Sequence, residues 1–188
     1  MFAAQQALEG IVWITLKEGD SISLLHNIGV YGFLFFSNLF WPVFVPYSLY
    51  ILEENKLRKK LLLSAFFLGV GVLLIFLFLW WTQERSAQIQ GHHIVYTSLS
   101  LTLSTLHITH IYLIKYVFFI AYLMSTVGVF FISSIRYIWV LGIILGIGLL
   151  ATVFYSSQSL VSIWCFFAAM GSIFIYFIVV KPSTHAKI

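Results

Sequence analysis

The stretch LLLSAFFLGVGVLLIFLFLWW, residues 61–81, decides the fold class because it carries no charged side chain over the length of a membrane-spanning helix. The whole chain of 188 residues is 61% hydrophobic and only 9% charged, whereas a soluble domain is about 25% charged. In lipid, backbone polar groups must pair within the protein, which leaves helices or closed barrels. The apolar runs are continuous rather than alternating, so the sequence predicts an all-α integral membrane protein.

Six apolar segments extend this pattern along the chain. They cover approximately residues 2–16, 26–52, 61–81, 110–134, 137–155 and 160–180. The first is short, because its fifteen residues at about 1.5 Å each reach about 22 Å, against about 30 Å of hydrocarbon. No linker divides the chain, so we expect a single domain, residues 1–188, built as a bundle of about six transmembrane helices.

Lysine and arginine are unevenly distributed between the two ends of this bundle. If all six segments cross, one side holds seven of the ten basic residues, namely Lys56, Arg58, Lys59, Lys60, Arg136, Lys181 and Lys187. Basic loops tend to stay in the cytoplasm, so we expect this side and both termini to be cytoplasmic, in a bacterial inner membrane. Because the cations flank membrane segments, those at 56–60 are expected to meet anionic lipid headgroups rather than nucleic acid.

The connection between residues 82 and 109 is expected to lie outside the hydrocarbon on the opposite side. From Leu99 to Ile111 apolar and polar side chains alternate with few breaks, which is a strand pattern. The sequence therefore favours a small β-hairpin over the outer mouth of the bundle, turning near residues 97–98 or 104–105. The alternative is that these residues form a polar start to the fourth helix.

Three polar side chains interrupt the first segment, in AAQQALEGIVW, residues 3–13. Gln5 and Glu9 are four residues apart and Gln6 is three from Glu9, so all three occupy one sector of a helix. An ionisable residue inside a membrane segment costs about 2.5–3.5 kcal/mol on insertion scales and is a candidate functional group. The alternative is a neutral Glu9 that joins helices by hydrogen bonds.

Most of the polar side chains fall in the outer half of the bundle, where we expect a polar pocket that opens away from the cytoplasm. The candidate residues of this ligand pocket are Gln5, Gln6, Glu9, Asn38, Lys115, Trp164 and Cys165. Cys165 is expected to be an inert buried thiol, because its setting is apolar. The cytoplasmic half of the bundle is expected to be almost purely apolar.

Two prolines lie inside the second segment, in SNLFWPVFVPYSLY, residues 37–50. Pro42 lacks the amide hydrogen that would bond to the Asn38 carbonyl, and Pro46 likewise frees the carbonyl of Pro42. A bend is expected here, with neighbouring helices or water satisfying the freed groups. A role of the bend in packing is favoured over a role in ligand binding.

Four histidines, His92, His93, His107 and His110, give the outer side a high local count of metal-ligating groups. Their spacing matches no known metal motif, and His92 and His93 would point to opposite faces of a strand. Roles as polar loop residues are therefore favoured over binding of a divalent metal such as zinc.

The fifth segment contains GIILGIG, residues 142–148, which forms a ridge of small residues. Such ridges let two helices approach closely. Gly142 and Gly146 are expected to serve packing inside the bundle or between the subunits of a homo-oligomer.

Four strings, taken together in their order and spacing, point to a family: QQALEGIVW, FWPVFVP, GHHIVY and SIWCFFAA. The chain resembles an uncharacterised family of small bacterial multi-pass membrane proteins over nearly its whole length. Members of that family begin with one further helix, so the resemblance implies that this chain lacks it. The bundle is also similar in architecture to the ceramidase-like membrane hydrolases, but their Ser, Asp and His arrangement has no residue-by-residue match here.

Three functions fit these observations, and none is fixed by a motif. The favoured one is an inner-membrane protein that binds or transports a small ligand, with Glu9 as its proton- or cation-sensitive anchor. The alternatives are an intramembrane metal-dependent hydrolase, with histidine ligands and Glu9 as base, and a structural or assembly protein.

The charge bias yields a test of topology. Reporter fusions after residue 58 and after residue 185 should both report the cytoplasm, because seven of the ten basic residues fall on that side. A fusion after residue 91 is the control and should report the opposite side. An external signal from either of the first two fusions would contradict the assignment.

Overall fold

The computed structural model describes residues 1–21, 23–82, 85–91, 93–96, 109–155 and 164–172, and only the backbone at residues 82, 109–115 and 155. Its helices are α1 (Phe2–Lys17), α2 (Leu24–Leu34), α3 (Trp41–Leu52), α4 (Lys56–Thr82), α6 (Thr109–Leu123), α7 (Val129–Ile132) and α8 (Ile138–Tyr155). Two π-helical stretches, η1 (Phe35–Phe40) and η2 (Met124–Gly128), join α2 to α3 and α6 to α7. Strands β1 (Ala87–Gln90) and β2 (His93–Tyr96) form a small sheet, and a last helix covers residues 164–172.

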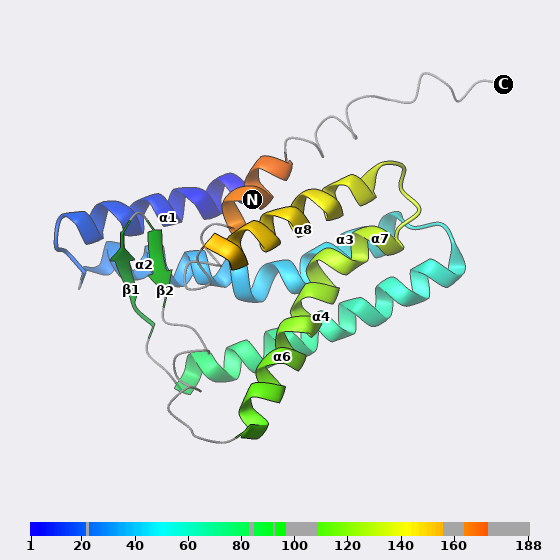
Figure 1. Cartoon of the computed structure of the whole chain (residues 1–188), viewed down its shortest axis with the longest axis horizontal. Helices are drawn as coiled ribbons and strands as arrows, with labels where there is room; N and C mark the ends of the chain where they lie inside the picture. Colours follow the sequence, from blue (N-terminus) through cyan, green and yellow to red (C-terminus); the bar gives the residue numbers. More distant parts are fainter. Residues whose placement is uncertain (22, 83–84, 92, 97–108, 156–163, 173–188) are drawn as a thin grey trace.

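The long helices lie side by side, with the small sheet at one end (Figure 1). α1 and α2 form an antiparallel pair, and α2, η1 and α3 continue as one run from Leu24 to Leu52. α4 then returns along α3, and α8 lies on the other side of α3. The predicted mostly helical fold with a small hairpin is thus confirmed.

Two helices, Leu24–Leu52 and Lys56–Trp81, are long and apolar enough to cross a membrane. Only 17% of the apolar window of the second is buried, which a core helix of a soluble protein would not show. Large side chains such as Trp81 and Phe154 are 91% and 87% exposed. The apolar helices Tyr116–Ile132 and Ile138–Phe154 are shorter, so the six-span bundle stays a prediction.

The start of α4 differs from the predicted residue 61. The Asn55 side chain accepts hydrogen bonds from the amides of Leu57 and Arg58, at 3.0 and 3.2 Å, and so caps a helix that begins at Lys56. The cluster of cations at 56–60 therefore lies on the first turns of a helix rather than in a loop.

The hairpin occurs earlier in the chain than the alternating pattern predicted. Ala87 pairs with Tyr96 and Gln90 with His93, and Gly91 has a φ of +62°, which glycine adopts at low cost in a tight turn. The alternating residues 99–108 and the predicted turns at 97–98 and 104–105 lie outside the described residues, and residues 109–111 belong to α6. The inward face of the sheet packs on Val12 and Phe33 of α1 and α2.

The prolines act through a π-helical step. The Trp41 amide bonds to the Phe36 carbonyl, five residues back, so the Ser37 carbonyl would need an amide hydrogen from residue 42, which is proline. The Tyr122 hydroxyl of α6 donates to this carbonyl at 2.6 Å. The sequence predicted that Pro42 would leave the Asn38 carbonyl, four residues back, without a donor. In the π-helical stretch the partner lies five residues back, so the carbonyl without an amide donor is that of Ser37.

The second freed carbonyl, that of Pro42, faces the backbone of α4. A Cβ atom placed on Gly69 would lie only 1.8 Å from the Pro42 oxygen. The two helices can therefore approach this closely only because residue 69 has no side chain, as at other close helix crossings. Gly71, two residues further along α4, has nothing within 4 Å of such an atom.

This contrast predicts opposite effects of the same substitution. Gly69→Ala should destabilise the protein by roughly 1–3 kcal/mol or more, because the Pro42 backbone must move away. Gly71→Ala is the matched control and should be neutral or stabilising by up to about 1 kcal/mol, since alanine is the better helix former. Thermal unfolding in detergent would measure both, and equal stability of the two variants would contradict the close approach.

Candidate functional site

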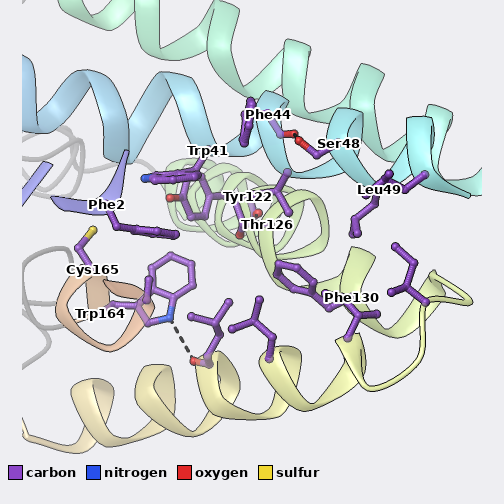
Figure 2. Close-up of a pocket in the computed structure, with 17 residues that line it drawn as sticks. Phe2, Trp41, Phe44, Ser48, Leu49, Tyr122, Thr126, Phe130, Trp164 and Cys165 are labelled. Atoms are coloured by element: carbon purple, nitrogen blue, oxygen red, sulfur yellow. Dashed lines mark hydrogen bonds between the residues drawn. The ribbon is translucent and has the colours of Figure 1, made fainter. Parts of the chain in front are cut away.

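An apolar cavity of about 300 Å³ lies between α3, α8, the η2–α7 region and the helix over residues 164–172. Hydrocarbon and aromatic side chains make up almost all of its wall. In Figure 2, one end is surrounded by the aromatic side chains of Phe2, Trp41, Tyr122 and Trp164. The other end reaches Leu52 and Ile135, beside the turns that follow α3 and α7. Its volume is at the lower limit of known ligand sites.

The length of α1 explains the position of the cavity. Its 16 residues span about 24 Å, while the run that it packs against, Leu24–Leu52, has 29 residues. α1 starts near the middle of the molecule (Figure 1), where the Phe2 ring stacks on Trp41 with 4.1 Å between centroids. Beyond this pair, α3 and α8 face each other across the cavity, η2 and α7 pack against both of them, and side chains of all four line it.

Gln5 connects three elements at the aromatic end of the cavity. Its side chain is fully buried, and its Nε2 donates to the Cys165 Sγ at 3.0 Å. The Trp41 Nε1 donates to the Gln5 Oε1 at 2.7 Å. A buried amide with both ends paired is stable in an apolar setting, so Gln5 ties α1 to α3 and to the helix over 164–172.

The other polar groups on the cavity wall already bond to the protein. The Trp164 Nε1 donates to the Leu145 carbonyl at 3.1 Å, as Figure 2 shows. The Thr126 and Ser48 hydroxyls donate to the carbonyls four residues before them, both at 2.8 Å. The Tyr122 hydroxyl likewise donates to the Ser37 carbonyl. The N–H and O–H donors of these side chains are therefore occupied, and a ligand could only donate a hydrogen bond to their hydroxyl oxygens.

Glu9 lies one turn along α1 from Gln5, half-buried, and does not line the cavity. Burial raises the pKa of Tyr96 on β2, and the negative charge of Glu9 raises it further, which places Glu9 close to Tyr96. The predicted polar set is thus divided. Trp164 and Cys165 line one end of the cavity, and Gln5 lies behind this wall, bonded to Cys165 and Trp41. Glu9 does not line the cavity and lies toward the hairpin.

The remaining predicted residues are scattered. Gln6 is half-buried on α1, and the Asn38 Oδ1 accepts a hydrogen bond from the Ser37 hydroxyl at 3.2 Å. Side chains of Lys115 and His110 lie outside the described part of the chain, and so do residues 92 and 107. His93 is half-buried at the start of β2. Within the described residues, no three His, Cys, Asp or Glu side chains form a group that could hold a metal.

The glycine ridge packs mainly within the chain. A Cβ atom on Gly142 would lie 2.8 Å from the Phe131 ring, whereas one on Gly146 would have nothing within 4 Å. Gly142 therefore serves packing of α8 against α7. A homo-oligomer through Gly146 stays a prediction.

Sequence reasoning missed the polar group at the other end of the cavity, Glu53, which is 1% exposed. Its carboxylate accepts hydrogen bonds from the Ser134 amide and hydroxyl at 2.7 and 2.5 Å, the Ser133 hydroxyl at 3.2 Å and the Asn55 amide at 3.1 Å. The expectation of a purely apolar half here is wrong, because a carboxylate with this many donors can be buried. Ser134 is 81 positions from Glu53, so no local spacing could reveal the pair.

A second missed contact joins the start of α2 to the end of α1. The buried His26 Nδ1 lies 2.8 Å from the Thr15 hydroxyl, which also bonds to the carbonyls of Ile11 and Val12. This contact between Thr15 and His26 stabilises the pairing of α1 with α2 on the side away from the cavity. An isolated histidine near a threonine carries no recognisable spacing in the sequence.

The comparisons with known proteins agree with the predicted resemblance. A family model matches residues 3–187, nearly the whole chain, and is described as a family of unknown function (DUF6629). The chain belongs to this family. Its predicted membership of an uncharacterised family is thereby confirmed, while bacterial origin and the four motifs stay predictions. No curated protein and no solved structure matches the chain.

The Glu53 cluster predicts how stability depends on pH. Desolvation raises the pKa of Glu53, but the hydrogen bonds from Ser134, Asn55 and Ser133 outweigh it and lower the pKa from 4.5 to about 2. The stabilisation is therefore complete above pH 4.5 and is lost as the pH falls toward 2. Glu53→Gln should unfold more easily at pH 7, by about 1–3 kcal/mol.

Thermal unfolding of both proteins between pH 7 and pH 3 would measure this effect. The difference in the free energy of unfolding between Glu53→Gln and the unmodified protein should become smaller as the pH falls. Glu54→Gln is the matched control, because Glu54 is exposed and adjacent. If this difference in the free energy of unfolding is the same at pH 7 and pH 3, the charge of Glu53 contributes nothing to stability.

Proposed function

We propose that this protein is a multi-pass membrane protein that binds a small apolar molecule in the cavity between α3 and α8. The apolar cavity of about 300 Å³ is the observation that carries the proposal. Two helices suited to crossing a membrane and the large exposed side chains on α4 and α8 support the membrane setting. Aromatic side chains supply much of the contact area that an apolar ligand would need.

The proposal moves the ligand from the vicinity of Glu9 to the cavity that begins at Phe2, the first residue of α1. Glu9 does not line the cavity, and the lining offers a ligand almost no polar surface. Binding would therefore depend on burial of apolar area, which stabilises by about 25 cal/mol per Å². The metal-dependent hydrolase is not favoured, since its site needs three ligands around one point and no three His, Cys, Asp or Glu side chains of the described residues form such a group.

The proposal is tested by filling the cavity. Ala168 lines it and is half-buried, so Ala168→Phe should occupy part of its volume. Ala151→Phe is the matched control, because Ala151 is exposed on α8 and does not line the cavity. Val45→Phe, on the α3 side of the wall, provides a second filling variant if the first folds poorly.

Bromododecane is a suitable ligand, because its bromine quenches the fluorescence of nearby tryptophans and Trp41 and Trp164 line the cavity. Quenching by bromododecane in detergent should weaken about tenfold in the filled variants, which corresponds to about 1.4 kcal/mol. It should be unchanged in Ala151→Phe. Equal quenching in all three variants and the unmodified protein would refute binding in the cavity.

A further inference from the structure

We infer that the occupant of the cavity is an anionic phospholipid, with one acyl chain inside and its phosphate against the basic residues beside Leu52 and Ile135. This inference rests on the proposed function and names the class of ligand. It combines three observations: the paired donors of the cavity wall, the exposed side of the opening, and the charge at one end.

The wall excludes a charged group from the interior. Its N–H and O–H donors bond to the protein already, from Trp41 to Gln5, from Trp164 to Leu145 and from Tyr122 to Ser37. A phosphate or carboxylate placed there would lose its hydration without gaining donors, which costs several kcal/mol. A hydrocarbon chain has no such requirement and gains from the apolar wall.

The opening lies along the exposed side of α3. Among the residues that line the cavity, Phe44 is 40% exposed and Leu52 is 62% exposed, the first in the middle of α3 and the second at its end. α3 belongs to a run suited to crossing a membrane. In that setting these side chains face lipid, and a chain can enter sideways from the bilayer while its headgroup stays at the surface.

Cations follow the lining residues at this end of the cavity, with Arg136 directly after Ile135 and Lys56 four residues after Leu52. Lys59 sits over the Tyr50 ring, 5.0 Å from its centroid, and the Arg136 guanidinium lies 4.8 Å from that of Tyr137. Exposed Lys56, Arg58 and Lys60 stand beside them on α4. Tyrosines are typical of the membrane interface, and the guanidinium fork matches the geometry of phosphate.

Glu53 brings these two groups of cations to one rim. Its bonds to Ser133 and Ser134 hold the turn that carries Arg136 against the turn that leads into α4. The carboxylate is buried and accepts four hydrogen bonds from uncharged groups of the two turns. Glu54, next to Glu53, is an exposed acidic residue, and the nearby basic residues are more numerous than this one acid.

The test compares two spin-labelled phospholipids with the same chains, phosphatidylglycerol and phosphatidylcholine, in nanodiscs that hold the full chain. The immobilised fraction measures binding, and the unmodified protein should prefer phosphatidylglycerol. Lys59→Gln and Arg136→Gln should each lower the preference about fivefold, as expected for one basic residue at an anionic surface. Lys17→Gln is the matched control, because Lys17 also lies over an aromatic ring, 5.6 Å from that of Trp13, far from the cavity.

The outcomes separate the two proposals. Ala168→Phe should release both lipids equally, and if it releases neither, the proposed function fails with the inference. If Ala168→Phe releases both but the unmodified protein binds them equally, the cavity holds a chain and only the anionic headgroup is refuted. A preference that is equally lost in Lys17→Gln would show general attraction to anionic lipid and would also overturn the inference.

Discussion

The constraint on which the structure depends is the shortage of hydrogen-bond donors in an apolar chain with two prolines in its central helix. The carbonyl groups of Ser37 and Pro42 have no amide partner within that helix. The first accepts from Tyr122 of α6 and the second lies against Gly69 of α4. Each freed group thus lies against a different neighbouring helix, and α6 and α4 both pack on α3 near the π-helical step.

The cavity follows from this arrangement. Trp41 follows the π-helical stretch and immediately precedes Pro42, and the Tyr122 side chain of α6 bonds to Ser37 beside it, so two aromatic walls of the cavity are positioned at this step. α1 begins at this level, with Phe2 stacked on Trp41 and Gln5 bonded to it. The polar groups near the cavity form hydrogen bonds between the helices, and the surface that faces the cavity is mainly hydrocarbon and aromatic. An apolar ligand is therefore the one that such a wall can accept without loss of hydrogen bonds.

The two ends of the molecule are stabilised differently. At the hairpin end, α1, α2 and the sheet share one apolar cluster with Glu9 close to Tyr96. At the other end, a single carboxylate, Glu53, joins two turns that carry much of the positive charge. This end has both a cation-rich rim and an adjoining apolar cavity, which is the pairing that an anionic lipid requires. Fold stability and the proposed lipid site thus depend on the same carboxylate.

The sequence alone determined the helical fold class and the approximate helix bounds, because continuous apolar runs and proline chemistry are local properties. It also predicted that Gln5, Trp164 and Cys165 belong to one pocket, since polar groups in an apolar chain tend to converge. Gln5 bonds to Cys165 in the structure, and the role of these three residues in binding a ligand stays a prediction. Only the tertiary structure decided that this site is an apolar cavity, that Glu9 lies apart from it, and that Glu53 is buried. Each of these depends on which distant side chain supplies the hydrogen bonds, and the partner of Glu53, Ser134, is 81 positions away. Local spacing carries no information about such pairs.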